Sequence, residues 1–126
     1  MLRLREALEA CWDPQTAYRN ADQRGNPALG QCYPTSRVVQ HYYPATEIIK
    51  GLVRSGETDH VHFWNGLRVG ADWYHIDFSW QQFPAGSVVR EFGALDRLNL
   101  GDSDATVQRC GLLLRRVEDY LQDNTL

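Results

Sequence analysis

Hydrophobic side chains recur at helical spacing near the two ends of the chain. Leu4, Ala7, Leu8 and Cys11 lie three or four positions apart, which predicts a helix from residue 2 to about residue 12. A second series follows the polar residues 102–104, which are typical of a helix N-cap. Its members are Val107, Cys110, Leu114, Val117 and Leu121. We therefore expect an N-terminal and a C-terminal helix, each with one face packed on a core.

A third helix is predicted to begin near Cys32, after a loop built on Gly30. Pro34 suits the first turn of a helix, where its missing N–H is not needed. Val38, Val39 and Tyr42 follow at helical spacing, and Pro44 ends the helix at residue 42 or 43. Residues 14–30, rich in glycine, proline and asparagine, are predicted to form a loop, with a short helical turn near residues 16–20.

The middle of the chain carries strand-like segments. Residues 47–53, 60–65 and 73–78 are rich in β-branched and aromatic side chains, and Gly70 lies between the last two, which predicts an antiparallel hairpin. Residues 88–100 allow two interpretations. Val88 and Val89 favour a short strand, whereas Phe92, Leu95 and Leu98 are spaced as on a short helix.

These elements predict one α+β domain covering residues 1–126: two terminal helices, a cysteine-bearing helix and a small antiparallel sheet. The composition, 43% hydrophobic and 23% charged, is ordinary for a soluble globular protein. A net charge of −3 gives no reason to expect a nucleic-acid partner. No apolar run approaches the ~20 residues that span a bilayer, so no membrane partner is expected. The oligomeric state is left open.

Two features favour a cytoplasmic location in a bacterial-type cell. The first six residues have no apolar segment of the signal-peptide kind. The three cysteines are odd in number and scattered, which does not suggest a disulfide framework. Cys11 and Cys110 fall on the predicted apolar helix faces and are interpreted as core residues.

The chemistry of the sequence centres on Cys32. A thiol at a helix N-terminus is favoured as the thiolate, which is the nucleophilic form. Because side chains alternate along a strand, His60 and His62 share one face of their strand, and Asp77 occupies one face of the next. If the hairpin turn centres on residues 69–70, His62 and Asp77 are cross-strand neighbours. Packing of the Cys32 helix on that face would unite a nucleophile, a base and a carboxylate that orients the base.

Several neighbouring residues are candidate helpers for such a site. The backbone N–H of Cys32 is a candidate oxyanion donor, and the side-chain amides of Gln31 and Asn65 are weaker candidates for the same role. Trp64 is expected to shield the site from water. His60 competes with His62 for the role of base. The chemistry requires no cofactor, and the substrate, whether a small molecule, a peptide or a protein, is not indicated.

Short blocks of the sequence resemble a known family. They are Gly30-Gln31-Cys32 with Thr35, Val38-Val39-Gln40, His62-Phe63-Trp64-Asn65, and Ile76-Asp77 with Gln82-Phe83. Together they resemble the YunG-like family of small bacterial proteins, over roughly residues 28–120. The order cysteine, histidine, aspartate is also similar to the core of the papain-like and transglutaminase-like superfamily.

The resemblance implies a compact α+β core of the cysteine-peptidase kind and names no substrate. The chain departs from the family pattern at Tyr33 and His41, where a small and an acidic residue are expected. Residues 66–71 also lack a turn of the Pro-Asp-Gly type.

The leading hypothesis is a cysteine-dependent hydrolase or acyl transferase for an amide or related carbonyl, with Cys32, His62 and Asp77 as catalytic residues. One alternative is a papain-like binding module without catalytic activity. Another is a metal-binding protein, since His60, His62, His75 and Asp77 share one face of the hairpin and offer ligands for zinc or another divalent ion.

Overall fold

The computed structural model describes residues 1–18, 26 and 28–123. In this part of the chain three α-helices accompany one four-stranded antiparallel sheet. The helices are α1 (Leu2–Cys11), α2 (Cys32–Tyr42) and α3 (Asp104–Asp123), and the strands are β1 (Glu47–Ser55), β2 (Thr58–Val69), β3 (Asp72–Ile76) and β4 (Val88–Ala94). A 3-10 turn, η2 (Trp80–Gln82), follows β3. The predicted α+β fold is confirmed.

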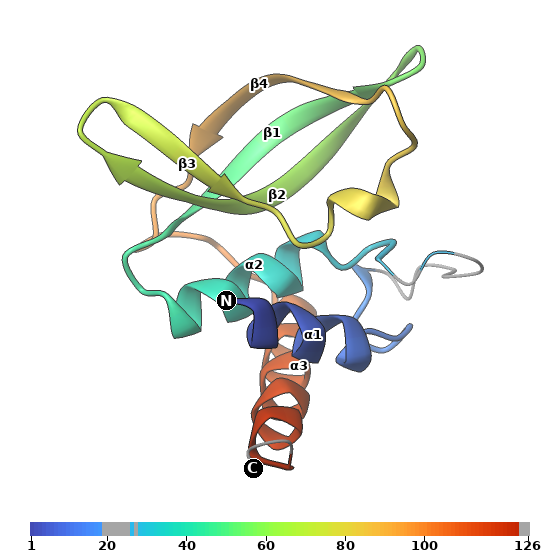
Figure 1. Ribbon diagram of the computed structural model, residues 1–126, viewed down its shortest axis with the longest axis vertical. Coiled ribbons are helices and arrows are strands. Elements are labelled where there is room, and N and C mark those ends of the chain that lie inside the picture. Colours follow the sequence, from blue (N-terminus) through green and yellow to red (C-terminus); the bar gives the residue numbers. More distant parts are fainter. Residues whose placement is uncertain (19–25, 27, 124–126) are drawn as a thin grey trace.

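The strand order in the sheet is β3-β2-β1-β4. Figure 1 shows the curled sheet lying over α2, with α1 beside α2 and α3 extending away from the sheet. The main hydrophobic core lies among the three helices, where Leu8, Val38, Leu113 and Val117 are fully buried. The sheet joins this core through Ile76 at the end of β3. The helices therefore form the base on which the sheet rests.

The structure decides between the two interpretations of residues 88–100. Val88–Ala94 form β4, which pairs with β1, so the helical interpretation is wrong for this segment. The spacing that suggested a helix came from Phe92, Leu95 and Leu98, of which Phe92 lies in the strand and Leu98 is 91% exposed. Apolar residues on an edge strand need not face a core, because one side of the sheet can be open to solvent.

The apolar face of α3 differs slightly from the predicted stripe. Leu113 and Val117 are the buried residues of this helix, whereas Val107 is 55% exposed. Val107 lies at a groove between α2 and the start of α3 that Arg37 and His41 also line, so its side chain stays partly open to solvent. Residues 14–30 are predicted as a loop with a helical turn near residues 16–20. Within this segment, residues 19–25 and 27 lie outside the described residues.

The register of the β2–β3 hairpin differs from the predicted one. Asn65 pairs with Ile76 and Gly66 with His75, so the turn centres on Gly70 and Ala71 rather than one residue earlier. Gly70 has φ +64°, a left-handed conformation that glycine adopts without strain. His62 consequently has no paired residue on β3, and Asp77 comes directly after the end of that strand.

Gly51 lies on β1 directly opposite His62 and leaves room for the Trp64 indole. A Cβ atom at this position would lie 2.5 Å from the Cη2 atom of Trp64 and 2.7 Å from the carbonyl oxygen of Glu91. The Trp64 ring in turn stacks on the His62 imidazole, with the centroids 5.5 Å apart. The missing side chain at position 51 thus allows the aromatic cover of His62.

We expect Gly51→Ala to lower the free energy of unfolding by about 1–3 kcal/mol, because the added methyl group overpacks the Trp64 indole and the β4 backbone. The matched control is Gly93→Ala on β4, where an added Cβ atom would meet nothing within 4 Å. Urea denaturation of the two variants measures the difference. Equal stability of both variants would contradict the close packing at Gly51.

Candidate functional site

Cys32 is the first residue of α2 and is partly exposed. The first backbone bond of the helix runs from the Thr35 N–H to the Gln31 carbonyl at 2.9 Å. The N–H groups of the first helical residues have no earlier turn to bond to and carry the positive end of the helix dipole. Cys32 also lines a pocket of about 730 Å³. Its sulfur is therefore at a position that favours an anion and opens to a cavity.

His62, on β2, is completely buried and bonded to a carboxylate. The distance from His62 Nε2 to Asp77 Oδ2 is 2.7 Å. The other oxygen of Asp77 accepts hydrogen bonds from the backbone N–H and the hydroxyl of Ser79, at 3.2 and 3.4 Å. Phe83 closes the site with its ring edge-on to the imidazole at 4.8 Å. The imidazole is thus fixed in orientation and shielded from water.

Asp77 reaches His62 although the two are not cross-strand partners. If the observed register continued, Asp77 would lie opposite Trp64, which is two residues along β2 from His62 and on the same face. Diagonal neighbours on one face of a sheet lie close enough for long side chains to meet. Because the chain leaves the strand after Ile76, the Asp77 carboxylate can turn toward the ring. The expected hydrogen bond is present, but the geometry that predicted it was wrong.

Cys32 approaches His62 in a way that the sequence did not indicate. The body of α2 packs on the opposite face of β2: the Tyr33 and Phe63 rings are 4.9 Å apart, and Asn65 donates to the Ser36 carbonyl. Cys32, at the start of the helix, lies beside His62 on a stretch of β2 that β3 does not cover. The segment with η2 passes near this end of α2 in Figure 1.

The environment of His62 favours its protonated form. Burial lowers the pKa of His62, but hydrogen bonds with Asp77 and Cys32, together with the negative charges of both partners, outweigh burial and raise the pKa to about 9. His62 is therefore mostly an imidazolium at neutral pH. A cation beside a cysteine stabilises the thiolate relative to the thiol, and the thiolate is the nucleophilic form.

Gln82 belongs to the site, although it was not among the predicted site residues. Its Nε2 atom lies 3.4 Å from His62 Nδ1 and donates to the Ser79 carbonyl at 3.1 Å. Gln82 also lines the same pocket as Cys32. The signal was present in the sequence, because Gln82 lies in the last block that resembles the YunG-like family, five residues after Asp77.

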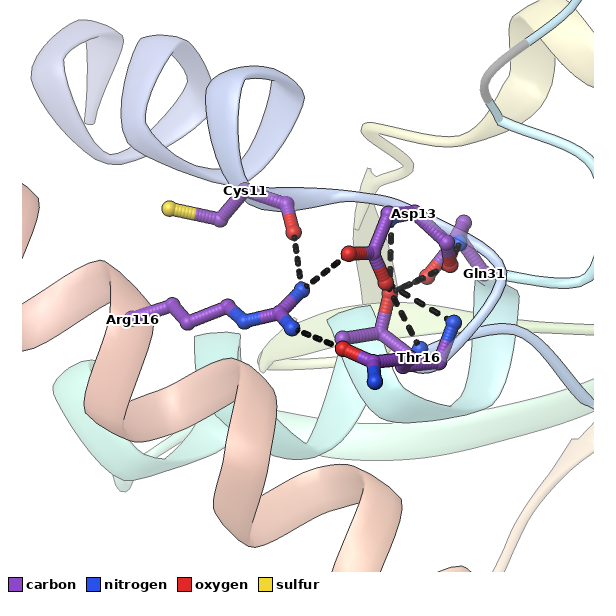
Figure 2. Close-up of polar contacts among 6 residues, drawn as sticks. Cys11, Asp13, Thr16, Gln31 and Arg116 are labelled. Atoms are coloured by element: carbon purple, nitrogen blue, oxygen red, sulfur yellow. Dashed lines mark hydrogen bonds and ion pairs between the residues drawn. The ribbon is translucent and has the colours of Figure 1, made fainter.

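Gln31 has a structural role in the positioning of Cys32. Its buried side-chain amide donates to the Asp13 carbonyl at 2.9 Å and accepts from the Thr16 hydroxyl at 2.8 Å. Figure 2 shows these contacts together with Arg116 of α3, whose guanidinium bonds to the Cys11 carbonyl and to the Asp13 carboxylate. The network ties the residue that precedes Cys32 to the ends of two other elements. These contacts occupy the amide expected to assist an oxyanion.

The other two candidate helpers are also accounted for. Asn65 is buried, and its Nδ2 atom donates to the Ser36 carbonyl at 2.9 Å and to the Thr46 hydroxyl at 3.4 Å, so this amide holds β2 to α2. Trp64 stacks on His62, and its indole N–H donates to His75 Nδ1 at 2.8 Å.

The histidines proposed as metal ligands are not gathered around one point. His60 is exposed and packs near the Phe83 ring, and His75 bonds to the Trp64 indole. Across residues 1–18, 26 and 28–123, no group of three or more His, Cys, Asp or Glu side chains is arranged to hold a metal ion. The described residues thus give the metal-binding alternative no support.

Comparison with known proteins places this α+β chain in a family. The model of the family described as YunG protein matches residues 1–122. The chain belongs to the YunG family. No curated protein and no solved structure matches it. No helix within the described residues is long and apolar enough to cross a membrane.

The raised pKa of His62 makes stability depend on pH. The pKa is about 9 in the folded chain and 6.5 for an unperturbed histidine. Because the folded value is the higher one, the stabilisation is complete below about pH 6.5 and is lost as the pH rises through 9. Between these limits we expect the contribution of His62 to the free energy of unfolding to fall by about 2–3 kcal/mol, measured as the difference between urea titrations of the wild type and of a variant without the Asp77 carboxylate.

Asp77→Asn is the variant that isolates this effect. It keeps the imidazole but removes the carboxylate that favours its protonation, so the loss of stability over the same pH range should be smaller. Imidazole chemical shifts in NMR titrations give the pKa of His62 directly in both proteins. A wild-type His62 that titrates near pH 6.5 would contradict the prediction.

Proposed function

We propose that this chain is a cysteine-dependent hydrolase or acyl transferase with a papain-like arrangement of catalytic groups, acting on an amide or related carbonyl. The observation that carries the proposal is the buried His62, which bonds to Asp77 and whose pKa is raised by both Asp77 and Cys32. A nucleophile, a base and an orienting carboxylate in this relation are the elements of a catalytic triad.

Each group has a defined task in the proposed reaction. The Cys32 thiolate attacks the carbonyl carbon and forms a carbon–sulfur bond, and the carbonyl oxygen takes the negative charge. His62 gives its proton to the departing amine as the carbon–nitrogen bond breaks, which leaves an acyl group on sulfur. Water or an acceptor amine then attacks this acyl group while His62 removes its proton. The acid or the new amide leaves, and the ion pair is restored.

Two further features support this chemistry. Asp77 holds the imidazole in one orientation and stabilises its positive charge, which matters because the ring must act first as acid and then as base. The N–H groups at the start of α2 provide donors for the developing oxyanion next to the attacked carbon. The choice between hydrolysis and transfer depends on which acceptor enters the pocket.

Reaction of the thiols with iodoacetamide at pH 6 tests the proposal. A thiol with an ordinary pKa of about 8.5 is less than ~1% thiolate at this pH, so only an activated cysteine reacts quickly. Burial raises the pKa of Cys11, and burial raises that of Cys110 to about 11. We therefore expect selective alkylation of Cys32, and we expect His62→Ala to slow it on the order of 100-fold.

The sequence makes this measurement simple, because trypsin places the three cysteines in separate peptides, at residues 6–19, 25–37 and 110–115. Mass spectrometry can follow each one. His60→Ala is the matched control, since it removes an exposed imidazole two residues away on the same face of β2. Equally slow alkylation of Cys32 in the wild type and in His62→Ala would refute the proposal and favour a binding module without catalytic activity.

A further inference from the structure

The pocket beside Cys32 has a distinctive lining. It lies between the start of α2, the α2-facing side of β1 and β2, and the segment that leads into α3. Its volume of about 730 Å³ is in the range of pockets that bind small organic molecules. Tyr33, Val61, Phe63 and Leu100 give it apolar and aromatic walls. A group bound next to the sulfur would therefore be largely apolar.

Two cations also line this pocket. Lys50 projects from β1, and Arg109 projects from α3. No carboxylate among the described residues forms an ion pair with either side chain. The Arg109 guanidinium stacks over the Tyr18 ring at 5.5 Å and bonds to the Thr106 hydroxyl, while its buried Nε atom has no hydrogen-bond partner within the described part of the chain. Arg109 thus lines the pocket as a cation without a carboxylate partner in the described part of the chain.

The acidic residue of the lining does not neutralise these cations. Asp102 lies 3.3 Å from the Arg37 Nε atom, and its other oxygen accepts a hydrogen bond from the Tyr33 hydroxyl. The proximity of this carboxylate, after burial, also raises the pKa of Tyr33, so the phenol stays a donor. Because the Asp102 charge is paired with that of Arg37, Lys50 and Arg109 leave the pocket with an excess of positive charge.

We propose that this pocket binds a peptide-like substrate with an apolar side chain and a free carboxylate, the carboxylate lying between Lys50 and Arg109. The inference rests on the proposed function, because the scissile carbonyl is placed at Cys32. The apolar walls take the side chain, and the two cations take the negative charge. An arginine fork matches the planar geometry of a carboxylate, and a nearby lysine adds a second charge.

Two affinity labels that differ only in charge test the proposal. They are N-bromoacetylphenylalanine and its neutral amide; each forms a carbon–sulfur bond with the Cys32 thiolate and releases bromide. At pH 6 and 0.15 M salt, we expect the acid to alkylate Cys32 about tenfold faster than the amide. The ratio of the two rates cancels differences in the reactivity of the thiol itself.

Arg109→Gln and Lys50→Gln should each reduce this ratio by about three- to tenfold. Lys50 is exposed, so its replacement leaves the core intact even where Arg109→Gln weakens the fold. Arg68→Gln is the matched control, because it removes the same charge from an exposed part of β2 outside the pocket lining. Its ratio should stay at the wild-type value, since salt screens distant charges.

The outcomes separate the two proposals. Both labels can alkylate Cys32 rapidly at equal rates, or at a rate ratio that neither pocket variant changes. Either result overturns the carboxylate site and leaves the proposed function standing. Alkylation that is equally slow with both labels, and no faster than in His62→Ala, overturns the proposed function and the inference together.

Discussion

The hydrogen bond between His62 and Asp77 is the interaction on which the site depends. A histidine that is completely buried would ordinarily lose its charge, because burial disfavours the imidazolium. The carboxylate at 2.7 Å reverses this preference. Ser79 holds the second oxygen of Asp77 in place, and the Trp64 ring stacks on the imidazole, so the buried pair is fixed in one geometry.

The positions of the helices and strands were readable from the sequence because they follow local patterns. Spacing and turn residues located α1, α2 and the hairpin to within a few residues, and the composition set the α+β class. The alternation of side chains placed His62 and Asp77 on the same face. These inferences needed only information carried by neighbouring residues.

Contacts between distant segments were less accessible. The hairpin turn lies one residue later than predicted, because a single glycine between two strands does not fix their register. The amides of Gln31 and Asn65 bond to partners far away in the chain, and nothing local to either residue announces such a partner. The contribution of Arg109 and Asp102 to the pocket depends on where α3 begins in space, and sequence spacing carries no such information. The position of Cys32 beside His62 is likewise a contact between distant segments that local sequence patterns do not predict.

The contacts of Arg116 have a consequence for how the domain is built. This side chain comes from the long C-terminal helix α3, and it bonds to the Cys11 carbonyl and to the Asp13 carboxylate. The Asp13 carbonyl in turn accepts a hydrogen bond from the Gln31 side chain. The segment that follows α1 therefore connects Arg116 of α3 with Gln31, the residue directly before the cysteine. During synthesis these contacts are absent until α3 has formed and packed, so Cys32 reaches its final surroundings only after α3 has docked.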